Sequence, residues 1–253
     1  MLTQVCWPLI FLALGCEYVD SSLGMGYGTT LTPLLLLLGY DMTQIVPSIL
    51  LSEFLTGILA GVLHHEFGNV DLKPGSRPFK VALVLASCSV IGTLAAVFVA
   101  ISVPTWMLKM YIGVLVLALG IGILLTIDKT FAFSWTKMVG LGLLAAFNKG
   151  MSGGGYGPLV TGGQIVSGMD DKGAIGITSL AEGLVCIVGV LAYKLTGNGA
   201  VDWALAPSLV VGAVLSVPLA TITVKKVPVR QMRWAIGIAV TALGLFTLAK
   251  LVI

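Results

Sequence analysis

Charged residues are scarce in this sequence, and this scarcity is the first constraint on its fold. Only 10% of the residues are Asp, Glu, Lys or Arg, whereas soluble domains carry about 25%. Because 57% of the residues are hydrophobic and the mean hydropathy is +1.05, this chain could not form a water-exposed surface. The formal net charge of +3 is too small to indicate nucleic-acid binding. The composition therefore predicts a protein covered mostly by the lipid bilayer.

Sequence motifs for enzymatic or redox chemistry are also missing. The four cysteines, Cys6, Cys16, Cys88 and Cys186, lie in apolar stretches without a CxxC spacing, so neither a disulfide framework nor a zinc site is indicated. We interpret them as small apolar packing residues. The sequence has no nucleophile–base pair, metal-ligand cluster or cofactor motif. We therefore predict that the protein is not an enzyme and needs no cofactor.

His64 and His65 do not indicate a metal site either. Adjacent histidines on a helix point in different directions, and this pair borders a loop that contains Glu66 and Asp71. We predict that both histidines lie at a solvated helix end.

Ten hydrophobic segments follow one another along the chain. They cover residues 5–23, 28–39, 42–64, 79–102, 106–127, 136–148, 156–168, 173–195, 203–223 and 234–252. The first lacks the preceding positive charge of a secretory signal, so we interpret it as a retained helix. Crossing the hydrocarbon core takes about 20 residues of helix, so segments 28–39 and 156–168 are short.

A glycine-rich break precedes each short segment. The sequence LGMGYG covers residues 23–28, and SGGGYG covers residues 152–157. Non-helical backbone is tolerated at membrane depth only where protein or a watery cavity surrounds it. Paired short segments with glycine interruptions point to the binding site of a transporter.

The two breaks belong to an internal duplication. Gly24–Gly28 aligns with Gly153–Gly157 without gaps, and each stretch contains a Tyr before its last Gly. The same register pairs Thr32 with Thr161, Gly39 with Gly168, Asp41 with Asp170, Glu53 with Glu182, and Gly68–Asn69 with Gly197–Asn198. We therefore predict two membrane-embedded repeats, residues 1–130 and 131–253.

An odd number of crossings in each repeat would invert the second repeat relative to the first. The number is odd whether every segment crosses or each short pair forms a re-entrant hairpin, and the sequence leaves this choice open. Only fusion of each short pair into one broken spanning helix would make the number even and give a parallel repeat. Loop charges favour inversion, with both termini extracytoplasmic. One face collects Lys73, Arg77, Lys80, Lys129, Lys137, Lys172, Lys225, Lys226, Arg230 and Arg233. The other face keeps only Lys109, Lys149, Lys194 and Lys250.

The helix that restarts after each break is predicted to bind a small anion. Its first turn presents unpaired N–H groups and the positive end of the helix dipole, and glycine lets the backbone approach a ligand. Two such ends would form a small electropositive pocket near the midplane. The predicted substrate-binding residues are Gly24, Gly26, Tyr27, Gly28, Thr29, Thr30, Asn148, Lys149, Gly153, Gly154, Gly155, Tyr156 and Gly157. The alternative is that these glycines only permit tight helix packing.

Charged residues inside the apolar segments are costly and indicate function. Lys149 is a candidate countercharge for the anion, or it could pair with Asp20, its counterpart in the first repeat. Glu53 and Glu182 could carry a coupling proton or accept backbone N–H groups at the breaks. Glu17 lies one turn before Asp20, and pore and packing roles both remain open for it.

These features resemble the TauE/SafE family of sulfite and organosulfonate exporters. The resemblance rests on LGMGYGTTLTP and NKGMSGGGYGPLVTGG, on the hydrophobic length, and on a duplication that spans almost the whole chain. It implies a bacterial inner-membrane protein that moves sulfite, sulfoacetate or related sulfur oxyanions and small organic acids. Glu17 and Asp20, two acids beside the first break, depart from the simple family picture. They could be proton-coupling or site-buttressing groups, or they could indicate a different substrate.

We therefore predict an all-α polytopic membrane protein, an inverted repeat of two five-segment halves. Its predicted function is the export of a small sulfur-containing anion by alternating access between the halves. The alternatives are a passive anion channel of the same fold and a transporter of another small organic or inorganic anion. The sequence leaves open the direction of transport and the formation of a homo-oligomer. It also leaves open the coupling ion, for which a proton is the candidate.

Overall fold

The computed structural model of the chain describes residues 6–127, 134–166, 169–196, 199–226 and 228–252. Gly168, Gly197, Asn198 and Lys129, which entered the repeat and charge arguments, lie outside these residues. The predicted boundary between the repeats, at residues 130 and 131, lies outside them as well.

The described chain forms ten helices and no strands, so the prediction of an all-α fold is confirmed. The helices are α1 (Trp7–Leu23), α2 (Tyr27–Leu37), α3 (Met42–Glu66), α4 (Arg77–Ser102), α5 (Thr105–Leu125), α6 (Trp135–Ser152), α7 (Tyr156–Val166), α8 (Asp171–Thr196), α9 (Ala206–Lys226) and α10 (Val229–Val252). They follow the hydrophobic segments in order. α6 continues to Ser152, beyond the segment expected to end at residue 148, and so contains Lys149.

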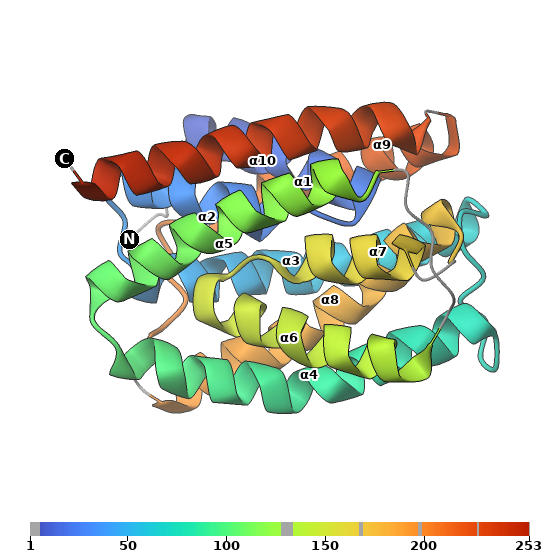
Figure 1. The fold of residues 1–253 in the computed structure, drawn as a ribbon, viewed down its shortest axis with the longest axis horizontal. Coiled ribbons are helices and arrows are strands. Elements are labelled where there is room, and N and C mark those ends of the chain that lie inside the picture. The colour runs from blue at the N-terminus through green and yellow to red at the C-terminus, as the bar shows by residue number, and fades with distance from the viewer. Residues whose placement is uncertain (1–5, 128–133, 167–168, 197–198, 227, 253) are drawn as a thin grey trace.

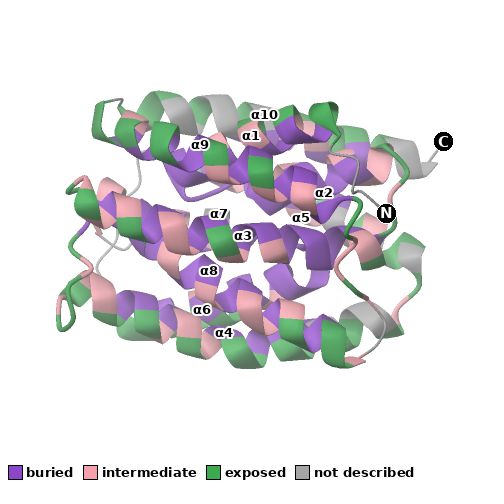
Figure 2. Ribbon diagram, turned by 180° about the vertical axis from the view of Figure 1, so that it is seen from behind, coloured by how far each residue is buried: buried purple, intermediate pink, exposed green. Residues whose placement is uncertain are grey.

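Length and apolar composition make this a multi-pass membrane protein. Four stretches are long and apolar enough to cross a bilayer, namely Met42–Glu66, Arg77–Ala96, Lys172–Thr196 and Ala206–Lys226. Large apolar side chains also cover the outer faces of the bundle, where Ile91, Phe11 and Leu195 are 70%, 66% and 86% exposed. Figure 2 shows the buried residues on the faces of the helices that meet inside the bundle. In water this surface would be unfavourable, whereas lipid solvates it.

Each helix of one half makes largely the same contacts as the corresponding helix of the other half. α1 packs against α9 and α6 against α4, and α3 contacts α9 as α8 contacts α4. The remaining main contacts join equivalent helices of the two halves, α3 with α8 and α5 with α10 (Figure 1). Duplicated sequences with the same apolar faces are expected to bury those faces in equivalent contacts.

The helix termini divide between the two ends of the bundle. α1 begins and α10 ends at one end, whereas α4, α6, α8 and α10 begin and α9 ends at the other (Figures 1 and 2). At this second end the ammonium of Lys172 donates a hydrogen bond to the carbonyl of Lys225 at 3.0 Å, which joins the start of α8 to the end of α9. The assignment of Lys149 to a loop face was wrong, because its side chain is fully buried in the bundle.

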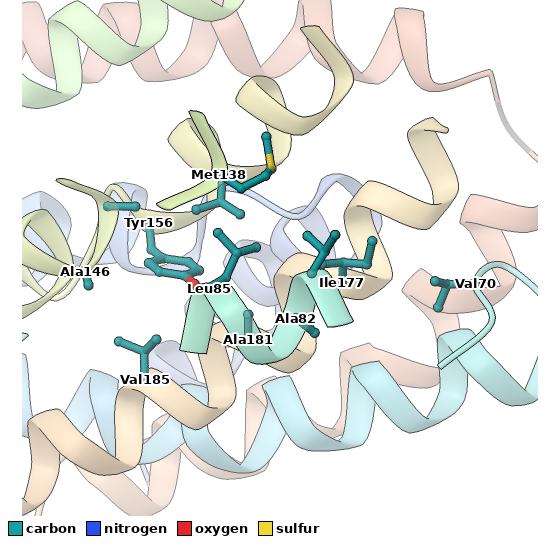
Figure 3. Packing of buried hydrophobic residues seen from close by; sticks show 12 residues of the cluster. Val70, Ala82, Leu85, Met138, Ala146, Tyr156, Ile177, Ala181 and Val185 are labelled. Atoms are coloured by element: carbon teal, nitrogen blue, oxygen red, sulfur yellow. The ribbon is translucent and has the colours of Figure 1, made fainter. Parts of the chain in front are cut away.

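The ring of Tyr156 fixes the start of α7 inside the second half. Figure 3 shows it among apolar side chains of α4, α6 and α8, including Leu85, Ala146 and Val185. Tyr156 is fully buried, so its ring holds the second glycine break against these three helices.

The two central helices, α3 and α8, meet through glycine. A Cβ on Gly57 would lie 2.7 Å from both the backbone nitrogen of Gly183 and the carbonyl oxygen of Ser179. Backbone atoms at this distance cannot move aside without separating the helices, so the contact admits only glycine.

We expect Gly57→Ala to lower the stability of the protein in detergent by about 1–3 kcal/mol, because the added methyl overpacks the α3–α8 contact. Gly140→Ala is the matched control, since a Cβ at this helical position meets no atom within 4 Å. Thermal unfolding followed by circular dichroism measures both variants. Equal melting temperatures for the two variants would contradict the assignment of this contact.

Candidate functional site

The first glycine break ends α1 and starts α2. Gly24 has φ +65° and donates its N–H to the carbonyl of Asp20 at 2.6 Å, which closes the C-terminus of α1. Gly26 has φ +136°, and α2 begins at the next residue. Such dihedrals favour glycine strongly, because a Cβ would clash with the backbone. The local sequence therefore dictates where the first helix stops.

The second break has the same local geometry. Gly153 has φ +72° and donates its N–H to the carbonyl of Lys149 at 2.8 Å. Gly155 has φ +80°, and α7 begins at Tyr156. The two positive-φ glycines occupy the aligned positions of the duplication, which places a new helix start after each break.

The two breaks pack directly on one another. A Cβ on Gly28 would overlap the carbonyl of Gly153, and a Cβ on Gly157 would overlap the carbonyl of Gly24. Two matching hydrogen bonds join them: Thr32 Oγ1 donates to the Ser152 carbonyl at 2.8 Å, and Thr161 Oγ1 donates to the Gly24 carbonyl at 2.7 Å. The structure brings the two breaks together, as predicted. In this conformation their glycines permit tight packing, which was the alternative to a role in anion binding.

The first N–H groups of α2 bind carboxylates of the chain itself. The N–H of Tyr27 donates to Asp20 Oδ1 at 3.2 Å, and the N–H of Gly28 donates to Glu53 Oε1 at 3.3 Å. At the second break, the N–H of Gly155 donates to Thr29 Oγ1 at 2.8 Å. Helix N-termini favour anions, and here protein carboxylates occupy the place predicted for a substrate anion.

Lys149 forms a buried ion-pair cluster with the two acids of the duplication. Its ammonium contacts the carboxylate of Glu53 and lies 2.7 Å from Oε1 of Glu182. Glu53 and Glu182 are only 2% and 4% exposed. The suggested pairing with Asp20 is not what the structure shows, because Asp20 instead caps α2. The cluster joins α3, α6 and α8 through charge-assisted hydrogen bonds, which are stronger than neutral ones.

A narrow polar crevice lies beside this cluster. It is lined by Glu17, Asp20, Ser21, Glu53, Thr56, Gly57, Ala60, Ser179 and Glu182, and it leaves no room for a water molecule. Its lining contains four carboxyl groups, so the predicted electropositive pocket was wrong for this conformation. Asp20, which lies just before the first break, and Glu53 of α3 accept the N–H groups that were predicted to bind the anion.

Three further polar contacts could not be predicted from the sequence. His64 is fully buried, so the prediction of a solvated position was wrong. Its Nε2 lies 2.9 Å from the carbonyl oxygen of Ser21, and its Nδ1 lies 3.1 Å from the side-chain amide nitrogen of Asn69. The Tyr27 hydroxyl lies 2.9 Å from Ser52 Oγ, which joins α2 to α3. No local pattern around these residues reveals such partners.

An apolar cavity of about 700 Å³ adjoins the second break. Side chains of α5, α6 and α7 line it, and Met25 of the first break reaches it as well. At its polar end the hydroxyl of Tyr111 donates a hydrogen bond to Asn148 Oδ1. Asn148, a predicted binding residue, therefore faces this cavity rather than the acidic crevice.

The fold and the site define a class: a multi-pass helical membrane protein whose buried charges gather at two paired helix breaks. Comparison with known proteins narrows this class. The sequence model of the family described as "Sulfite exporter TauE/SafE" matches residues 9–247, and the chain belongs to this family. It is 28% identical over 238 residues to the "Probable membrane transporter protein YtnM" of Bacillus subtilis (strain 168), covering 90% of this chain and 77% of that protein. No solved structure matches the chain. The protein is a membrane transporter and not an enzyme.

We expect Lys149→Met to lower stability by about 3–5 kcal/mol, because it leaves the carboxylates of Glu53 and Glu182 buried together without their cation. Adding Glu53→Gln and Glu182→Gln to this variant should restore much of the loss. Lys194→Met, at an exposed lysine on α8, is the control. Thermal unfolding in detergent distinguishes these cases. A Lys149→Met variant as stable as the control would mean that the cluster does not hold the helices together.

Proposed function

We propose that this transporter exports a small sulfur-containing anion, such as sulfite or an organosulfonate, across the bacterial inner (plasma) membrane. The family description supports this substrate class. The observation that carries the proposal is Lys149, a fully buried cation at the second break, held by two carboxylates that an anion could replace. A buried charge is costly, and in a membrane transporter it marks the substrate or ion pathway.

The geometry supports transport by alternating access. The breaks are in contact and the crevice beside them admits no water, so the site is closed in this conformation. Opening requires one half to move relative to the other and separate Gly28 from Gly153. An entering anion then takes the place of a glutamate carboxylate on Lys149 and at the N–H groups of α2. Ligand binding shifts the equilibrium towards whichever state gains these contacts.

We expect the melting temperature of the purified protein to rise with the transported anion, because a ligand that binds the folded state stabilises it by mass action. The probes are sulfite, thiosulfate, sulfate, sulfoacetate, acetate and chloride. Lys149→Ala should abolish the shift, and the exposed control Lys194→Ala should retain it.

The same panel separates this proposal from its rivals. Stabilisation by acetate or chloride alone would assign a different substrate class. Counterflow in proteoliposomes then tests the mechanism: a carrier exchanges labelled for unlabelled anion, whereas a channel of the same fold only equilibrates it. Stabilisation by no probe would contradict the assignment of Lys149 to the binding site.

The proposal includes an inverted repeat with both termini extracytoplasmic. Its support is the distribution of basic residues, since Arg77, Lys172 and Lys225 lie near turns at the end of the bundle away from the termini. Cytoplasmic loops are enriched in Lys and Arg.

Green fluorescent protein fused after Ile253 should therefore stay dark in cells, because it does not fold after export, whereas alkaline phosphatase fused there should be active. Fusions after Lys226, at the end of α9, are the matched control and should show the opposite result. A fluorescent fusion at Ile253 would reverse the orientation.

A further inference from the structure

Glu17 is a buried acid without a complete set of partners. It lies on α1 one turn before Ser21 and is 1% exposed. Its Oε1 accepts a hydrogen bond from the Ser21 hydroxyl at 2.7 Å, whereas Oε2 has no hydrogen-bond partner among the described residues. The side chain lines the acidic crevice. Burial of a carboxyl oxygen without a hydrogen-bond partner is costly, so we expect Glu17 to have a functional role.

Among the described side chains, none that faces Glu17 is a cation. The titratable groups that face it are Cys16 and Asp20 on its own helix, Tyr27 on α2, Glu53 on α3 and Glu182 on α8. The cation of the cluster, Lys149 on α6, is already shared by Glu53 and Glu182. α1 also contacts α9 and α10. The basic residues of these two helices whose side chains are described lie at the end of α9 and the start of α10. They are Lys225, Lys226 and Arg230, and all three are exposed.

An isolated carboxylate in such surroundings takes up a proton rather than remain charged. A metal ion does not fit the crevice, which has no room for a water molecule. In the part of the chain that the structure describes, no three His, Cys, Asp or Glu side chains are placed to hold a metal ion. The small ion that the site can accept is therefore the proton.

We infer that Glu17 is the proton-carrying residue of the transport cycle. In the closed state Glu17 holds a proton as a neutral acid. When the crevice opens to water on one side of the membrane, the carboxyl releases this proton to water, and it binds one from water on the other side. Glu17 is linked to the anion site through the shared crevice, because Glu53 lines that crevice and also holds Lys149 and the N–H of Gly28. This inference rests on the proposed function for the alternating access of the crevice and for the identity of the anion.

Infrared spectroscopy tests the proton on Glu17 without any substrate. The purified protein at neutral pH should show the carbonyl stretch of a protonated, buried carboxylic acid. Glu17→Gln should remove this band, because the amide keeps the acceptor for Ser21 but holds no acidic proton. Glu66→Gln, at an exposed acid that ends α3, is the matched control and should leave the band unchanged. Absence of the band in the unmodified protein, or its persistence in Glu17→Gln, would overturn the inference.

Proton movement during transport is the second test, with sulfoacetate as the probe because both of its acid groups stay ionised near neutral pH. Proteoliposomes that contain a pH-sensitive dye report protons moved for each sulfoacetate transported. We expect this ratio to fall at least tenfold in Glu17→Gln and to be retained in Glu66→Gln. An unchanged ratio in Glu17→Gln, or transport that follows a sodium gradient instead, would contradict a proton carried by Glu17. If the unmodified protein moves no sulfoacetate, the proposal fails for this organosulfonate, while the infrared band still decides whether Glu17 holds a proton.

Discussion

The buried ion-pair cluster of Lys149 with Glu53 and Glu182 is the interaction on which the rest of this structure depends. It joins α6 to the two central helices, α3 and α8, at a depth where no water is available to replace a lost partner. Each charge is tolerable only because the others are present. Such a cluster can exchange one carboxylate for an external anion, but removal of a partner without replacement leaves a buried charge unpaired.

The glycine breaks provide the geometry that places this cluster. Positive φ at Gly24 and Gly153 stops α1 and α6, and the lack of side chains at Gly28 and Gly157 lets the backbones of the two breaks touch. Threonine hydroxyls and backbone contacts hold the two breaks together, so this centre is closed in the present conformation. The glycines pack tightly here, and the proposed access of substrate requires a second conformation in which the breaks separate.

The acids occupy the helix terminus that was predicted to bind an anion. Asp20 and Glu53 accept the N–H groups at the start of α2, so the protein satisfies this helix terminus with its own carboxylates. Glu17 stands apart, since one of its oxygens has no partner among the described residues and no cation faces it. Asp20 and Glu53 thus support the helix terminus, whereas Glu17 is the acid to which we assign the exchangeable proton.

The sequence by itself determined the helical membrane fold, the two helix breaks and the importance of Lys149, Glu53 and Glu182. These follow from local causes, because apolar length sets a membrane helix, glycine permits positive φ, and charge in an apolar segment is costly. Only the tertiary structure decided that Lys149 pairs with the two glutamates, that carboxylates line the crevice, and that His64 is buried. Each of these depends on residues far apart in the chain, whose meeting is set by how ten helices pack together, and no local pattern encodes that packing.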